Sequence, residues 1–440
     1  MSGSPSPAPR RRSTGGSAFT SSPAAARRRC SSSPRSASRC SRSRRRSKVA
    51  WRSSSPGACS GSARPPRYGR SVEHAFGTSA LFSLGIEEEF QLLSAESYEL
   101  VPRFDEVAQA AQDERIRQEL MTSVLEAATG VHERAADAVA ELREIRARLT
   151  AAAGQHGALL ASAGTHPFSR WEHQEITDTP RYQGVVEKLR WVAERVAIFG
   201  LHIHVGMPEP DLAVRVATGL RNWVPELLAL SANSPYWQGY DTGLSSTRSQ
   251  VFDVMPRSGL PPRLSSFAQF EQLVRRGEAA GFFSDYTYIW WDIRPHPKLG
   301  TIEVRVCDAQ TRIETVAGIA ALVQSLAATV AERPVPIQPR TLIAENKWRA
   351  ARHGLDAELV DLRRDRPRPA REAVRELVEL AAPAASALGC AVELDEIEGL
   401  LDRGSGADEQ RLAHGADGSL LSVARWLAEE TVGDAGRSTH

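Results

Sequence analysis

The sequence is poor in cysteine and in long apolar runs. Of its five cysteines, three fall within residues 1–72, and only Cys307 and Cys390 remain for the rest of the chain. Their spacing suggests no disulfide framework, so a reducing cytoplasm is the expected location. No run of about 18 consecutive apolar residues is visible, so no membrane span or membrane partner is expected.

Lysine is scarce, and acidic residues are absent from the beginning of the chain. Residues 1–72 hold 17 of the 55 basic residues and no Asp or Glu. The formal net charge of +2 therefore hides a basic segment and a body with 38 basic and 53 acidic residues. A body with that negative balance is a poor surface for phosphate backbones, so no nucleic-acid partner is expected for it.

Residues 1–75 consist mainly of Ser, Pro, Arg, Ala and Gly, and they lack the periodic apolar residues of a packed core. Such a segment is predicted to be disordered. It has the composition of an organellar transit peptide, it could act as a basic nucleic-acid-binding arm, or it reflects a start site placed too early, with translation beginning near Val72. The absence of aromatic or Gly-rich RNA-binding patterns among the arginines favours the start-site interpretation.

The segment Leu84–Leu93 has the pattern of a half-buried strand with three consecutive acids. Side chains alternate along a strand, so Glu87 and Glu89 face one side and Glu88 the other. Two carboxylates about 7 Å apart on one face repel each other unless a cation lies near them. A hard divalent cation is the usual remedy, although an exposed acidic edge strand would show the same pattern.

Two later segments place paired polar residues opposite an apolar face in the same way. His202 and His204 alternate with apolar residues, which suggests metal or phosphate binding, although each could also be a satisfied core histidine. The strand Thr301–Asp308 places Glu303 and Arg305 together on the face opposite its apolar residues. A cross-strand salt bridge is the simpler interpretation of that second pair.

Three further regions carry candidate residues. Tyr286–Arg294 alternates and is predicted to pair with Thr301–Asp308 as a hairpin. Arg248 stands among hydroxyl side chains in a long aperiodic loop, which suits a phosphate or carboxylate. Glu119 and Glu126 lie in a segment whose periodicity does not distinguish a helix from a strand. From the residues alone, both are interpreted as surface charges.

The C-terminal part, residues 312–433, has an almost entirely helical pattern. Helices are expected at 312–332, 342–353, 371–388, 394–402 and 418–431. If the polar strand faces belong to one antiparallel sheet, they offer carboxylates, imidazoles and a guanidinium, which suit Mg²⁺ or Mn²⁺ together with phosphate oxygens. No P-loop or GxGxxG phosphate cradle is present.

Several motifs resemble one known family over residues 80 to 432. They are Gly85-Ile-Glu-Glu-Glu-Phe, Gly200-Leu-His-Ile-His-Val-Gly, Asn233-Ser-Pro, Trp291-Asp-Ile-Arg-Pro, Gly300-Thr-Ile-Glu-Val-Arg and Glu345-Asn-Lys-Trp-Arg. In this order they resemble the type 2 glutamate–cysteine ligases, which are carboxylate–amine ligases. The resemblance implies a glutamine-synthetase-like α+β fold, with a curved antiparallel sheet, helices on its convex face and a helical C-terminal part. It also implies a single catalytic domain at 76–433, followed by a flexible C-terminus at 434–440.

The resemblance implies ATP and Mg²⁺ or Mn²⁺ as cofactors and L-glutamate and an amine such as L-cysteine as substrates. The expected product is γ-glutamylcysteine, formed through a γ-glutamyl phosphate with release of ADP and phosphate. The alternative function is a metal-dependent phosphotransferase that acts on an acidic acceptor. A weaker alternative is nucleic-acid binding through the basic arm. The protein could also form a homodimer. The implied metal ligands are Glu87, Glu89, Glu119, Glu126, His202 and Glu303. The implied catalytic residues are Arg305, Arg248 and Arg294, and the implied nucleotide contacts are His204, Asn346, Lys347 and Arg349.

Overall fold

The computed structural model describes residues 71–361, 364 and 366–433. The predicted disordered segment therefore lies outside the described residues up to residue 70, as does the predicted flexible C-terminus. Residues 71–75, which the sequence placed in the tail, lie against the domain. The backbone N–H of Val72 donates a hydrogen bond to Glu271 Oε1 at 2.9 Å.

The domain is built on a seven-stranded sheet in which every pairing is antiparallel. The strand order is β10-β11-β5-β1-β3-β2, and β4 also pairs with β1. Apolar residues of the strands alternate with polar ones, so one face is apolar and the other carries charged side chains. The strands are β1 (Leu84–Ser94), β2 (Ile116–Gln118), β3 (Val124–Ala128), β4 (Ala158–Ala161), β5 (Gly200–Gly206), β10 (Ile293–His296) and β11 (Thr301–Asp308).

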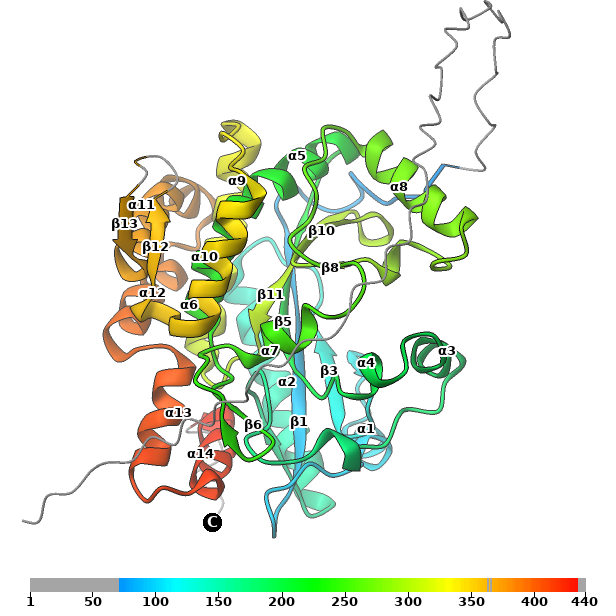
Figure 1. The fold of residues 1–440 in the computed structure, drawn as a ribbon, viewed down its shortest axis with the longest axis vertical. Helices are drawn as coiled ribbons and strands as arrows, with labels where there is room; N and C mark the ends of the chain where they lie inside the picture. Colours follow the sequence, from blue (N-terminus) through cyan, green and yellow to red (C-terminus); the bar gives the residue numbers. More distant parts are fainter. Residues whose placement is uncertain (1–70, 362–363, 365, 434–440) are drawn as a thin grey trace, which may run out of the picture. The chain divides into compact units, whose positions relative to one another are not determined.

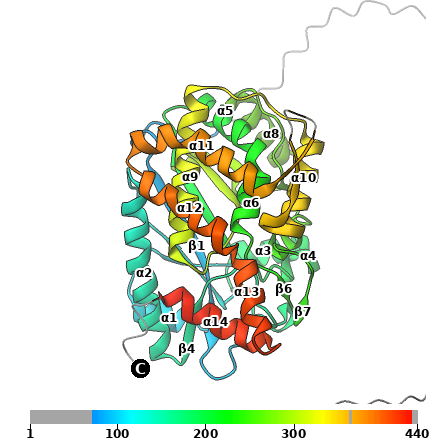
Figure 2. The ribbon, with the colours of Figure 1, turned by 90° about the vertical axis from the view of Figure 1, so that its left-hand side faces the viewer.

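Helices cover the apolar face of this sheet, and a second set of helices packs behind them (Figures 1 and 2). The helices in contact with the sheet include α2 (Ala135–Gln155), α5 (Pro210–Leu220), α6 (Val224–Ser231), α9 (Ile313–Glu332) and, against β4, α14 (Leu420–Val432). Behind and beside them lie α10 (Arg340–His353), α11 (Ala370–Leu388), α12 (Ala391–Arg403) and α13 (Gly406–Gly415). This arrangement confirms the α+β fold class and the helical C-terminal part that the sequence predicts.

Shorter elements complete the domain. The helices are α1 (Phe104–Ala111), α3 (Pro180–Leu189), α4 (Trp191–Glu194), α7 (Thr247–Phe252) and α8 (Phe267–Ala279). The two-residue strands are β6 (Tyr236–Trp237), β7 (Tyr240–Asp241), β8 (Ser258–Gly259) and β9 (Trp290–Trp291). A separate hairpin joins β12 (Glu358–Asp361) and β13 (Arg366–Pro369).

Helix α9 contains no unbroken run of 18 apolar residues, but by length and composition it is the one helix of the described residues that could cross a membrane. The helix has 20 residues, and the mean hydropathy of an 18-residue stretch within it is 1.6. However, 83% of this 18-residue stretch is buried within the domain, where α9 packs against the sheet, α5, α11 and α12. A helix that is apolar on all sides is expected at such a central position.

A buried ion pair lies behind the central strand. Glu88 faces the helices, as the alternation of β1 predicts, and Arg146 of α2 donates to both of its carboxylate oxygens, at 2.6 and 3.0 Å. Ser162 Oγ donates to the same carboxylate at 2.9 Å. The remaining guanidinium donors bind the backbone oxygens of residues 310, 311 and 431. Because Arg146 donates to both carboxylate oxygens of Glu88, the ion pair fixes the position of α2 relative to β1.

The structure differs from the sequence predictions in three places. Tyr286–Tyr288 forms a turn of 3₁₀ helix, so the predicted strand shortens to β9 and β10. Helix α13 and the β12–β13 hairpin interrupt the predicted series of C-terminal helices. Glu126 lies buried in β3, and Glu119 lies in the connection that precedes it, so the interpretation of Glu126 as a surface charge is wrong.

Candidate active site

The strand register brings the predicted polar residues together on one face of the sheet. Residues directly opposite each other on antiparallel strands point to the same side. Glu87 of β1 lies opposite His202 of β5, and Glu89 lies opposite Glu126 of β3. In the same way His204 lies opposite Glu303, and Glu303 lies opposite Arg294.

Two groups of potential metal ligands share one histidine. Ligand atoms of Glu87, His202 and Glu303 all lie within 4.8 Å of one another, and so do those of Glu89, Glu126 and His202. His202 Nε2 is buried and has no hydrogen-bond partner among the described residues. Carboxylate oxygens beside an imidazole nitrogen without a partner fit Mg²⁺ or Mn²⁺.

The acids on the β3 side of the face are only partly compensated by positive charge, which for Glu126 comes from Arg117 at 3.8 Å. Burial, reinforced by the charges of Glu87, Glu119 and Glu89, raises the pKa of Glu126 well above its usual range. Burial and the charge of Glu119 raise the pKa of Glu89 to about 7, and burial also raises the pKa of Glu119. Carboxylates crowded in this way favour a multivalent cation, because it would remove their mutual repulsion.

The acids on the β11 side are paired with cations instead. Burial alone would raise the pKa of Glu303, but Arg294 and Arg305 hold it well below its usual range. Arg294 Nε donates to Glu303 Oε2 at 2.6 Å, and Arg305 forms an ion pair with the other oxygen. Glu87 Oε2 lies 3.5 Å from His202 Nδ1 and 3.4 Å from His204 Nε2. Burial would also raise the pKa of Glu87, but His204 and His202 hold it well below its usual range.

Two arginines are positioned beside this face by different elements. Arg248 lies in the first turn of α7, whose N-cap is Ser246, and its guanidinium donates to the backbone oxygens of Arg305 and Val306, both at 3.3 Å. A Cβ at Gly200 would collide with this guanidinium and with the ring of His202, so the position requires glycine. The Nε atoms of Arg248 and Arg305 have no hydrogen-bond partner among the described residues.

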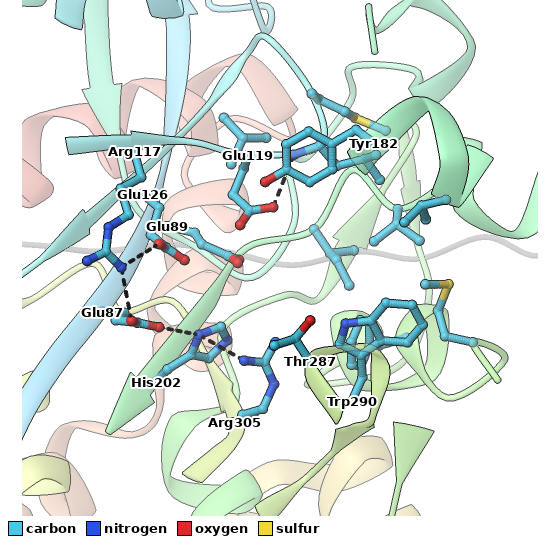
Figure 3. A pocket seen from close by; sticks show the side chains of 18 of the residues that line it. Glu87, Glu89, Arg117, Glu119, Glu126, Tyr182, His202, Thr287, Trp290 and Arg305 are labelled. Carbon is cyan, nitrogen blue, oxygen red and sulfur yellow. Dashed lines mark hydrogen bonds and ion pairs between the residues drawn. The ribbon is translucent and has the colours of Figure 1, made fainter. Parts of the chain in front are cut away.

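A cavity of about 320 Å³ opens over the charged face (Figure 3). The acids of β1 and β3 line one side of it, and Arg305 lies across from them. A third side is apolar and can hold an uncharged part of a ligand. Its lining residues are Leu120, Met121, Val124, Val185, Val196, Ile198, Phe252, Met255 and Trp290.

Most of the predicted site residues gather at this cavity. Glu119 lines it but belongs to neither three-ligand group. Arg248 and Arg294 line it as well, although Arg294 also donates to the backbone oxygens of Thr287 and Ile289. His204 is buried beside Glu87, and burial alone would lower its pKa, which the charges of Glu87 and Glu303 raise.

The three predicted nucleotide contacts on α10 do not line the cavity. Asn346 exchanges hydrogen bonds with the backbone of Val360, and Arg349 pairs with Glu345 on the surface. Lys347 is buried between Asp253 and Asp292, with its Nζ 2.8 and 2.9 Å from their carboxylates. The geometry gives no support to nucleotide contacts by these residues, and the assignment stays a prediction.

The structure adds lining residues that the sequence did not single out. Arg117 Nη1 lies 3.4 Å from Glu87 Oε1 and 3.8 Å from Glu126 Oε1. Arg181 of α3 donates to Thr287 Oγ1 at 3.2 Å. Tyr182 and His296 also line the cavity. The only sequence signal for Arg117 is its place beside the predicted acidic segment, and that signal becomes useful once the β2–β3 register is known.

Comparison with known proteins shows the family of the chain. The family described as "Glutamate-cysteine ligase family 2" matches residues 83–426. A relative from Rubrobacter xylanophilus, named "Putative glutamate--cysteine ligase 2-3", is 46% identical over 364 residues, which cover 82% of this chain and 100% of that protein. A relative from Thermobifida fusca, named "Putative glutamate--cysteine ligase 2", is 36% identical over 367 residues, which cover 81% of this chain and 92% of that protein.

Solved structures share the fold at low sequence identity. A glutamate–cysteine ligase from Francisella tularensis in complex with AMP superposes with a TM-score of 0.61 at 14% identity, covering 81% of this chain and 90% of that one. A bifunctional glutathione synthetase from Pasteurella multocida gives a TM-score of 0.59 at 14% identity. The match covers 80% of this chain and 52% of that one. Fold and family together define an ATP-dependent ligase that joins a carboxylate to an amine through a carbon–nitrogen bond. The chain belongs to glutamate–cysteine ligase family 2.

Proposed function

We propose that the protein is a glutamate–cysteine ligase. An oxygen of the glutamate side-chain carboxylate attacks the γ-phosphorus of ATP, and ADP leaves. The amine nitrogen of cysteine then attacks the resulting acyl phosphate, phosphate leaves with the bonding electrons, and the amine loses a proton. The products are γ-glutamylcysteine, ADP and phosphate. The family and its relatives support this choice of substrates.

The observation that carries the proposal is that acidic and basic side chains line one cavity together. Carboxylates of β1 and β3 and His202 of β5 line the same space of about 320 Å³ as the arginines of α7 and β11. A triphosphate and a carboxylate substrate both carry negative charge, so a site that brings them together must supply positive charge. The arginines supply part of it, and the acidic side fits a divalent cation that supplies the rest.

The chain's own residues divide this work. Two groups of side chains would hold the cation. One is Glu87, His202 and Glu303, and the other is Glu89, Glu126 and His202. When bound, Mg²⁺ or Mn²⁺ neutralises phosphate charge. Arg305 and Arg248 lie where they can bind the transferring phosphoryl group, and Arg294 holds the carboxylate of Glu303 in position.

A screen of ADP release with pairs of amino acids and Mg²⁺ tests the proposal. We expect turnover that requires both L-glutamate and L-cysteine. ATP hydrolysis that needs neither would contradict a ligase. Turnover with glutamate and a different amine would agree with a carboxylate–amine ligase, but it would show that cysteine is not the required amine substrate.

Hydroxylamine distinguishes the ligase from the phosphotransferase alternative. Only an acyl phosphate reacts with hydroxylamine to give a hydroxamate, so we expect a γ-glutamyl hydroxamate when cysteine is omitted. A stable phosphorylated acceptor without hydroxamate would favour the phosphotransferase. The cytoplasmic location, the homodimer and the absence of a nucleic-acid partner stay predictions.

A further inference from the structure

Lys347 of α10 belongs to a charged cluster that no step of the proposed reaction uses. Its Nζ lies 2.8 Å from the carboxylate of Asp253, at the end of α7, and 2.9 Å from Oδ1 of Asp292, between β9 and β10. The side chains of Lys347 and Asp292 are only 6% and 7% exposed. A cluster that merely fastens α10 to these elements accounts for the contacts of Lys347. It leaves Asp292 Oδ2 unexplained, because this buried oxygen has no hydrogen-bond partner among the described residues.

A small cavity joins this cluster to two arginines of the candidate active site. Its volume is about 10 Å³, and its lining residues include Asp253, Asp292, Arg248 and Arg305. Both arginines also line the cavity over the charged face. Asp292 Oδ2, Arg248 Nε and Arg305 Nε are all buried without a hydrogen-bond partner among the described residues. Such atoms are costly to bury, so three of them around one small space call for a shared partner.

One acceptor and two donors match the hydrogen-bonding capacity of a single water. A cavity of about 10 Å³ has about the room that one buried water requires. The water would accept from the two Nε–H groups and donate to Asp292 Oδ2. Burial raises the pKa of Asp292, and the charges of Lys347 and Arg248 oppose that rise, so the carboxyl group lies within electrostatic range of both cations.

The main chain links Asp292 to the same arginines. The pairing of β11 with β5 shifts register between Val304 and Cys307. Within this shift the backbone N–H of Arg305 donates to the backbone oxygen of Asp292 at 2.8 Å. Arg248 donates to the backbone oxygens of Arg305 and of the residue after it. Irregularities of this kind, such as β-bulges, re-aim side chains next to active sites.

We propose that Asp292, held in place by Lys347, is a positioning residue that orients the guanidinium groups of Arg305 and Arg248 through one ordered water. The inference rests on the proposed function, which places these two arginines at the transferring phosphoryl group. Lys347 then acts on the nucleotide site indirectly. It fixes Asp292 and makes no contact with the nucleotide itself.

Calorimetric titration of the full-length protein with β,γ-imido-ATP and Mg²⁺ tests the inference. Asp292→Asn keeps the shape and an oxygen for Lys347, but it turns an amide N–H group toward the two Nε donors. We expect it to weaken the analogue by about tenfold and ADP by less than about twofold, because ADP lacks the γ-phosphate. Asp253→Asn is the matched control. Both oxygens of Asp253 already accept from Lys347, so this change should alter either affinity by less than about twofold.

A double-mutant cycle shows whether Asp292 acts through the arginine. Arg305→Lys should itself weaken the analogue. The double variant Asp292→Asn, Arg305→Lys should lose clearly less affinity than the product of the two single losses. Lys347→Met is a second variant with the same expected pattern as Asp292→Asn. Circular dichroism and thermal melting show which variants are folded.

Three results would overturn the inference. The first is that the wild type does not bind the analogue, or that folded Asp292→Asn and Lys347→Met bind it like the wild type. The second is that these variants weaken ADP as much as the analogue, which is the mark of a merely structural role. The third is that the losses of Asp292→Asn and Arg305→Lys multiply. A lack of ADP release with glutamate and cysteine would instead refute only the proposed function, because the analogue is titrated without either amino acid.

Discussion

Glu89 and Glu126 lie directly opposite each other on neighbouring strands, and their oxygens share a potential cation position with His202. Like charges opposite each other destabilise a sheet. The domain therefore keeps a locally unfavourable arrangement at the position where the proposed reaction needs a cation.

Glu89→Gln should reduce turnover by about 100-fold or more, because it removes a ligand charge and keeps the side-chain shape. Steady-state ADP release at saturating Mg²⁺ measures the effect. Glu96→Gln is the matched control, since its side chain is exposed on the turn after β1. Unchanged turnover in Glu89→Gln, with the control equally active, would refute the metal assignment.

Mg²⁺ or Mn²⁺ should stabilise the wild-type protein and should stabilise Glu126→Gln much less. At about 100 times the dissociation constant, a ligand that binds only the folded state adds about 2.7 kcal/mol to the free energy of unfolding. Thermal melts with and without a chelator measure this difference. Equal stabilisation of Glu126→Gln and wild type would place the cation elsewhere.

Gly200→Ala should lower turnover strongly, because the new methyl group meets the guanidinium of Arg248 and the ring of His202. Both groups would have to move away from the new methyl group and so change their positions in the site. Gly154→Ala is the control, because a Cβ there meets no atom within 4 Å and the residue lies in α2. That change should stabilise the helix by about 0.5–1 kcal/mol and leave activity unchanged. Full activity in Gly200→Ala would show that the positions of these two side chains are not critical.

Arg146→Met should reduce the free energy of unfolding by about 3–5 kcal/mol, because it leaves the buried charge of Glu88 unpaired. The double variant Arg146→Met, Glu88→Gln should recover part of this loss. Denaturant unfolding of the single and double variants measures the coupling. Additive losses would show that the two residues do not act as a pair.

Stability should respond to pH through Glu226. Burial, partly opposed by Arg368, raises the pKa of this carboxyl group to about 7 from 4.5. The folded state therefore keeps a proton that the unfolded state releases, so the stabilising contribution is complete below pH 4.5 and is lost as the pH rises through about 7. Relative to Glu226→Gln, the wild type should lose about 1–3 kcal/mol over this range in chemical denaturation. Parallel pH profiles for the two proteins would contradict the shift.

Strand alternation was sufficient to predict which side chains share a face. It separated Glu87 and Glu89 from Glu88, and the structure confirms that Glu88 pairs behind the sheet. It also placed Glu303 on the charged face. Alternation depends only on the two-residue repeat of a strand, so it can be predicted without knowledge of the fold.

Features that depend on register or on helix rotation were not predictable in this way. Arg117 reaches Glu87 and Glu126 only because β2 pairs with β3 in one particular register. The motif on α10 was expected at the site, but Lys347 lies between two aspartates that do not line the cavity over the charged face. The order of strands in the sheet is a tertiary property that no local pattern contains.

The contacts of Arg146 also determine when the site can form during synthesis. This arginine holds Glu88 of β1 and donates to the backbone oxygen of Thr431 in the last turn of α14, 285 residues further along the chain, at 3.4 Å. Thr431 Oγ1 in turn accepts a hydrogen bond from the backbone N–H of Ser162 beside β1. The support behind Glu87 and Glu89 is therefore incomplete until α14 has left the ribosome. A nascent chain that lacks this helix would carry the acidic strand without its full backing, so a functional cation site is a late event in the folding of this domain.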